Sequence, residues 1–144
     1  MRYIFKVSGV PPVSLNKIYA GIHWSDRKKY KDDWREAMCG WHFHKDQKGN
    51  LNASNPVRFT EPVHIAYLFR QKKPMDSSNL AFMVKLIEDS LSIDQVIQDD
   101  TPKYVLSTWM VPIFAHDNSV TVVISTQDET PLTYAELLLT EPDE

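Results

Sequence analysis

Apolar residues recur along this chain with two different periods, and each period predicts a different element. Residues 2–10 and 63–70 alternate apolar with other side chains, a period of two that predicts a strand over each segment, the second of them half-buried. Residues 80–91 instead repeat apolar side chains every three or four positions, which predicts an amphipathic helix. Its apolar face would consist of Leu80, Met83, Val84, Ile87 and Leu91.

The remaining segments complete the order of elements. A helix is predicted after the N-cap candidate Ser25, because the apolar residues that follow it share one helical face: Tyr30, Trp34, Met38 and Trp41. Residues 45–62 are polar and rich in Asn, which is typical of a loop, and residues 92–102 form a second loop containing acids. Residues 104–111 and 119–126 favour strands, and Thr133 with Glu136 matches a capping box at the start of a short helix.

This order predicts an α+β fold: one compact domain with a mixed β-sheet, two main helices and a short C-terminal helix. We divide the chain into a domain over residues 1–127 and an acidic segment with the short helix over residues 128–144. A length of 144 residues and a hydrophobic content of 42% fit one globular domain. Cys39 is the only cysteine, and no apolar run is long enough for a membrane helix, so we expect a soluble cytoplasmic protein.

The charges are distributed unevenly along the chain. Six of the 19 acidic residues follow residue 127, where there is no Lys or Arg, so the first 127 residues hold 16 basic and 13 acidic side chains. The overall charge of −3 thus conceals an excess of three positive charges over most of the chain. An anionic partner is compatible with this distribution.

The candidate chemistry lies between residues 76 and 100. At about 100° per residue, Ser78, Lys85 and Asp89 fall within about 40° of one another, opposite the apolar face of the predicted helix. Asp76 directly precedes this helix, whereas Asp99 and Asp100 follow it in a loop that can fold back. Converging carboxylates suit a hard cation such as Mg²⁺. The alternative is that Lys85 and Asp89 form an ordinary surface pair and the loop acids are solvated.

At these residues the sequence resembles the RusA-type Holliday junction resolvases. Residues 11–19 are similar to the N-terminal signature of that family, Pro-Pro-x-Ser-x-Asn-x-x-Tyr, which includes Asn16. The family pattern continues as Asp-x-Asp-Asn-Leu, a helical Lys, an Asp four residues later, a Leu two further on, and then an Asp-Asp pair. In this chain the matching residues, in order, are Asp76, Asn79, Leu80, Lys85, Asp89, Leu91, Asp99 and Asp100.

The resemblance implies a homodimeric endodeoxyribonuclease that depends on Mg²⁺, with Mn²⁺ as a substitute. Its substrate would be branched DNA, a four-way junction cut by paired nicks, in a bacterial or phage-associated setting. By resemblance, metal would be held by Asp76, Asp99 or Asp100, and Asp89, while Lys85 would stabilise phosphate or leaving-group charge. All five residues are therefore candidate catalytic residues.

Two departures from the family pattern leave an alternative function open. Ser78 stands where the family has its second Asp, and the interval from Asn79 to Lys85 is about three residues longer, close to one helical turn. Ser78 could bind metal through its hydroxyl, or Glu88 could substitute for the missing carboxylate. The alternative is a protein of the same fold that binds branched DNA with weak cleavage or none; an unrelated small α+β protein is a further alternative.

Basic residues near these positions are candidates for binding DNA. Arg27, Lys31 and Arg35 recur every four residues along the first predicted helix, although Asp32, Asp33 and Glu36 interleave with them and an ordinary salt-bridged surface is an equal alternative. A second group, Arg70, Lys72 and Lys73, leads directly into Asp76, where a polyanionic substrate would require cations.

Overall fold

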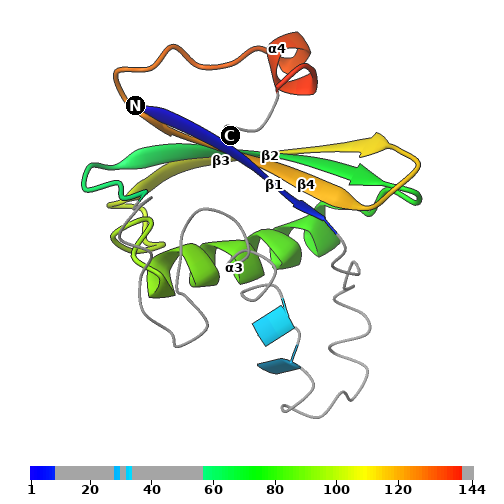
Figure 1. The fold of residues 1–144 in the computed structure, drawn as a ribbon, viewed down its shortest axis with the longest axis horizontal. Coiled ribbons are helices and arrows are strands. Elements are labelled where there is room, and N and C mark those ends of the chain that lie inside the picture. The colour runs from blue at the N-terminus through cyan, green and yellow to red at the C-terminus, as the bar shows by residue number, and fades with distance from the viewer. Residues whose placement is uncertain (9–27, 30–31, 34–56, 141–144) are drawn as a thin grey trace.

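The described strands form one mixed sheet with a helix on each face (Figure 1). The computed structural model describes residues 1–8, 28, 29, 32, 33 and 57–140. Strands β1 (Arg2–Ser8), β4 (Ser119–Thr126), β2 (Val63–Gln71) and β3 (Val105–Phe114) lie side by side in that order. Only the β2–β3 pair is parallel; the other two pairs are antiparallel. The single α+β domain with a mixed sheet, predicted from the sequence, is confirmed.

Several predicted elements and candidate residues lie outside the described part of the chain. Of the first predicted helix, only residues 28, 29, 32 and 33 are described, and all four are helical. The DNA-binding candidates Asn16, Arg27, Lys31 and Arg35 lie outside the described part of the chain, as does most of the predicted loop over residues 45–62.

Helix α3 (Ser77–Ile93) connects the two parallel strands and covers one face of the sheet (Figure 1). Parallel neighbours need such a crossover, because a tight turn can only reverse the chain. The helix begins at Asp76, whose Oδ1 accepts the backbone N–H of Asn79 at 3.0 Å. It ends at Asp94, and Gln95 then adopts a left-handed conformation with φ of 60°, as residues that follow a helix often do.

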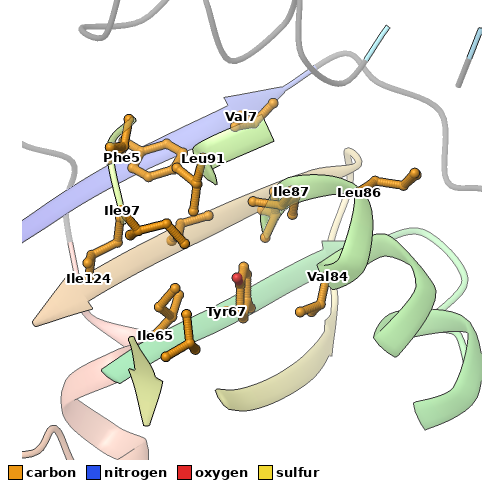
Figure 2. Packing of buried hydrophobic residues seen from close by; sticks show 14 of the residues in the cluster. Phe5, Val7, Ile65, Tyr67, Val84, Leu86, Ile87, Leu91, Ile97 and Ile124 are labelled. Atoms are coloured by element: carbon orange, nitrogen blue, oxygen red, sulfur yellow. The ribbon is translucent and has the colours of Figure 1, made fainter. Parts of the chain in front are cut away.

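The main core lies between α3 and the sheet, as Figure 2 shows. The five apolar helix positions predicted from the sequence are all buried there, against Phe5, Ile65, Tyr67 and Ile124 among others. Burying one such side chain contributes about 1.5–3 kcal/mol, so this face fixes the position of α3. Leu86 is also fully buried, although it does not belong to the predicted stripe.

The opposite face of the sheet has a smaller core, closed by helix α4 (Tyr134–Leu138). Leu137 is fully buried against Leu68, Val111 and Val123. Strand β2 is therefore buried at Leu68 as well as on its α3 side, which corrects the prediction that this strand is only half-buried. The predicted capping box of α4 is confirmed: the Thr133 side chain accepts the backbone N–H of Glu136, and the Glu136 side chain accepts that of Thr133.

Leu137→Ala tests how strongly α4 holds to the sheet. We expect the free energy of unfolding to fall by about 2–4 kcal/mol, because the change leaves a cavity among fully buried side chains. Leu139→Ala is the matched control, since this side chain is 80% exposed and should shift stability by less than about 0.5 kcal/mol. Urea unfolding of both variants measures the difference, and equal effects would contradict the packing of α4.

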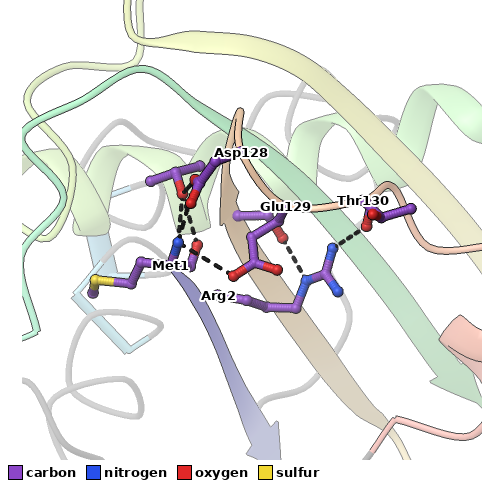
Figure 3. A network of polar contacts seen from close by, with 7 residues as sticks. Met1, Arg2, Asp128, Glu129 and Thr130 are labelled. Carbon is purple, nitrogen blue, oxygen red and sulfur yellow. Dashed lines mark hydrogen bonds and ion pairs between the residues drawn. The ribbon is translucent and has the colours of Figure 1, made fainter.

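Polar contacts tie the acidic segment after β4 to the first two residues of the chain (Figure 3). The Met1 ammonium lies 3.4 Å from Asp128 Oδ1 and 3.2 Å from Glu129 Oε1. The Arg2 guanidinium donates to Ser125 Oγ and to the Thr130 carbonyl. Residues 128–130 are thus held against the start of β1, and the described part of the segment, up to residue 140, packs on the same sheet as the rest of the domain.

Strand β3 lies at one edge of the described sheet and contains no charged residue. Pro112 has no N–H to donate to a neighbouring strand, so an edge position suits it. Phe114 at the end of this strand is 81% exposed, and it leads into the turn with His116 and Asp117 that joins β3 to β4. The sequence favours a turn rather than a catalytic pair at these two residues, and the structure has a turn there.

Candidate functional site

Lys85 joins two carboxylates that come from different parts of the chain. Its Nζ lies 2.7 Å from Asp89 Oδ1, one helical turn further along α3. It also lies 2.6 Å from Asp100 Oδ2, in the loop between α3 and β3. The loop therefore folds back onto the helix face that holds Lys85 and Asp89, as the sequence analysis expects for Asp100. The surface pair between Lys85 and Asp89, which is the alternative interpretation, is present as well.

These contacts shift the pKa values of the paired groups in opposite directions. The hydrogen bond from Lys85 holds the pKa of Asp100 below its ordinary value of 3.8. The hydrogen bonds to Asp100 and then to Asp89 raise the pKa of Lys85 above its ordinary value of 10.5. Two carboxylates and one ammonium give the cluster a formal charge of −1, which favours a cation.

Asp99 supports the position of Asp100. Its Oδ1 accepts the backbone N–H of Asp100 at 2.8 Å, which fixes the turn of the loop at that residue. The two adjacent acids therefore have different environments: Asp100 faces Lys85, whereas Asp99 has one carboxylate oxygen engaged by the backbone. From the sequence alone either acid could be the metal ligand, and only the folded loop distinguishes the two.

Glu88 lies under this cluster and faces the sheet. Its Oε1 accepts hydrogen bonds from the Tyr67 hydroxyl at 3.1 Å and the Thr108 hydroxyl at 3.3 Å. Burial raises the pKa of the Glu88 carboxyl above its ordinary value of 4.5, and the hydrogen bonds from Tyr67 and Thr108 oppose that rise. The sequence contains a signal for this burial. Val84 lies four residues before Glu88 and Leu91 three residues after it, and these spacings place Glu88 on the edge of the apolar face.

Glu88→Gln should change how stability depends on pH. Because the folded pKa of Glu88 is raised, the wild-type free energy of unfolding should decline as the pH rises from about 4.5 through that folded value. Glutamine keeps an oxygen that accepts from Tyr67 and Thr108 but does not ionise, so the variant should lack this part of the decline and be more stable near pH 7. Chemical unfolding at several pH values measures both curves; parallel curves would contradict the burial of an ionisable Glu88.

Asp76, Ser78 and Asn79 lie at the other end of α3. Asp76 and Asp89 are separated by 13 helical positions, or about 20 Å along the helix axis. Asp76 caps the helix, and the exposed Ser78 belongs to its first turn. The structure therefore does not bring Asp76 together with Asp89, Asp99 and Asp100 within the chain, and its role in metal binding stays a prediction from the sequence.

The basic residues predicted to bind DNA also separate. Lys72 and Lys73 are exposed in the loop that follows β2. Arg70 belongs to β2, and its guanidinium donates to Thr121 Oγ1 at 2.6 Å. Because side chains alternate along a strand and Phe69 faces α3, Arg70 faces the opposite side of the sheet from Lys85.

A cavity of about 430 Å³ lies beside the Lys85 cluster. Asp89 and Asp100 are part of its wall, and Leu86 and Ile93 contribute apolar surface. Lys28 and Asp32, from the described parts of the first helix, also line it. In Figure 1 these short pieces lie on the side of α3 that faces away from the sheet. The place of Lys28 at this cavity does not follow from the sequence, because its spacing does not distinguish it from the neighbouring lysine.

The donor set at this cavity is compatible with Mg²⁺. Lys85 Nζ is 2.7 Å from one carboxylate oxygen and 2.6 Å from the other, so those oxygens of Asp89 and Asp100 are at most about 5.3 Å apart. Two oxygens bound to one Mg²⁺ are separated by up to about 4 Å, and protein Mg²⁺ sites often use only one or two carboxylates with waters and phosphates. Among the described residues, no three His, Cys, Asp or Glu side chains form a metal-binding group. A site here would therefore rest on two carboxylates.

A scan against models of known protein families finds no match for this chain, and a search of curated proteins finds none either. Among the described residues, no helix has both the length and the apolar character to cross a membrane.

Proposed function

We propose that this chain is a metal-dependent endodeoxyribonuclease that cuts branched DNA, as its resemblance to the RusA-type resolvases implies. The observation that carries the proposal is the convergence of Asp89 and Asp100 on Lys85 beside a cavity. Carboxylates from a helix and a following loop can hold a cation, and a lysine beside them can stabilise the charge that develops on a phosphodiester during hydrolysis. The family, the DNA substrate and the homodimer rest on the resemblance.

The residues would divide the chemistry between them. Asp89 and Asp100 would hold Mg²⁺ or Mn²⁺, which when bound supplies an activated water and withdraws charge from the phosphate. A cation between these carboxylates would take over the charge balance that Lys85 provides. The Lys85 ammonium, protonated at neutral pH, would then be available to a phosphate oxygen or to the leaving oxygen as negative charge develops there.

A homodimer would account for paired nicks. Two copies related by a two-fold axis present two equivalent sites, and a four-way junction offers two equivalent strands to them. The described part of the acidic segment, residues 128–140, lies on the opposite face of the sheet from α3, so the charges of Asp128, Glu129 and Glu136 are kept away from the cavity. This arrangement is favourable for a polyanionic substrate approaching Lys85.

The test is cleavage of a labelled four-way junction, compared with a linear duplex of the same arm sequences. We expect symmetric nicks in the junction with Mg²⁺ or Mn²⁺ and none in EDTA. Junction binding without nicks in either metal would favour the alternative, a DNA-structure-binding protein in which Ser78 marks a lost ligand. A chain that neither binds nor cuts the junction would overturn the proposal.

A further inference from the structure

Lys28 is the one described lysine in the wall of the cavity. It is exposed, and Asp32, four positions later in the sequence, lines the same cavity. Lys29 is its immediate neighbour and is also exposed, yet it is not among the residues that line the cavity. Two adjacent lysines of equal charge are thus distinguished by position alone, since consecutive helix residues point about 100° apart.

The charges around the cavity decide what it can bind. The described charged residues in its wall are Lys28, Asp32, Asp89 and Asp100, and Lys85 outside the wall pairs with the last two. The formal charges of these five residues sum to −1, which is unfavourable for an anionic ligand. One bound divalent cation changes the sum to +1 and makes the cavity attractive to a phosphodiester, with Lys28 as a second positive group beside the Lys85 cluster.

Resting on the proposed function, we infer that Lys28 binds a DNA backbone phosphate next to the one that is cut, and that it does so only with a divalent cation in the site. A cavity of about 430 Å³ has room for part of a nucleotide. Ile93, which is 57% exposed, supplies an apolar surface for the sugar or base, while the lysine meets the phosphate. Lys28 is then a substrate-binding residue, and it increases affinity rather than activating water.

The experiment measures junction binding in Ca²⁺, chosen to support binding with little cleavage, and in EDTA, as salt is varied. In Ca²⁺, Lys28→Ala should weaken binding about five- to tenfold, and the slope of log K against log[salt] should become shallower by about 1, the loss of one phosphate contact. Lys28→Arg should keep the wild-type slope, because it keeps the charge. Lys29→Ala is the matched control and should leave the slope within about 0.3 of the wild type.

Each outcome has a distinct meaning. In EDTA, where the cavity would have a net negative charge, Lys28→Ala and Lys29→Ala should bind alike. Equal slopes for the two alanine variants in Ca²⁺ would overturn the inference about Lys28 while leaving the nuclease intact, provided that the wild type cuts the junction. A wild type without any junction binding would overturn the proposed function itself. Circular dichroism of the variants controls for folding, which these exposed lysines should not affect.

Discussion

Asp100→Asn is expected to reduce metal-dependent cleavage of a four-way junction by at least about 100-fold. In the proposed mechanism Asp100 is one of two carboxylates that hold the cation, and a bound cation contributes several kcal/mol of transition-state stabilisation. Since each 1.36 kcal/mol is a factor of ten in rate, losing about 3 kcal/mol gives a reduction of this size. Junction affinity should be retained or become tighter, because one negative charge facing the DNA is removed. Single-turnover cleavage and binding in Ca²⁺ measure the two effects separately.

Two variants control for this substitution. Asp99→Asn keeps an oxygen that can accept the backbone N–H of Asp100, so it should preserve the loop and reduce cleavage less than Asp100→Asn does. Asp117→Asn removes an exposed carboxylate in the β3–β4 turn and should cut at the wild-type rate. If Asp100→Asn also cut at the wild-type rate, the assignment of this metal site would be wrong even though the nuclease activity was real.

Lys85→Met should lower cleavage by about 100-fold or more while making the protein respond more strongly to Mg²⁺. Methionine keeps the apolar stem of the lysine but removes the ammonium that would meet developing phosphate charge, an effect worth about 10²–10³ in rate at comparable sites. It also leaves Asp89 and Asp100 without their shared cation. Mutual repulsion should then destabilise the fold near pH 7, and a divalent cation should restore what is lost.

The response to Mg²⁺ and to pH checks this second prediction. The thermal midpoint of Lys85→Met should rise more with Mg²⁺ than that of the wild type, whereas Lys103→Met, outside the site, should behave as the wild type. In the wild type the pKa of Asp100 is depressed, so the stability from its pairing is present above about pH 3.8 and is lost as the pH falls through the lower folded value. Lys85→Met should lose less stability in that range. Identical metal responses in both methionine variants would exclude a cation site at the two carboxylates.

The sequence predicts the elements of this fold well because burial leaves a local periodic trace. The apolar face of α3 and the capping box at Thr133 follow from spacings of three or four residues, and both are confirmed. The order of strands does not follow, because a strand's own residues do not specify its neighbours. The burial of Leu68 does not follow from local spacing either, because it depends on Leu137, which comes from a helix 69 positions later.

The candidate site shows the same limit. Lys85 and Asp89 are four residues apart on one helix, so their pairing follows from the sequence. The loop after α3 is short, which makes the approach of Asp100 foreseeable. The burial of Glu88 could have been recognised from its apolar neighbours at helical spacing, but its partners Tyr67 and Thr108 come from two different strands. The place of Lys28 at the cavity depends on where residues 28 and 29 lie relative to α3, and no local pattern encodes that.

The pairing of β1 with β4 has a consequence for how the chain reaches its native state. Arg2 and Ser125 meet across this pair although 123 positions separate them, and β4 also joins β1 to β2. The sheet is therefore completed by its last strand, and β1 has no partner among the described strands until about residue 126 has been synthesised. Such long-range closure favours slow folding, and it leaves the apolar side of β1, with Phe5 and Val7, exposed during synthesis. Chaperone dependence during synthesis is the property that this topology leads us to expect.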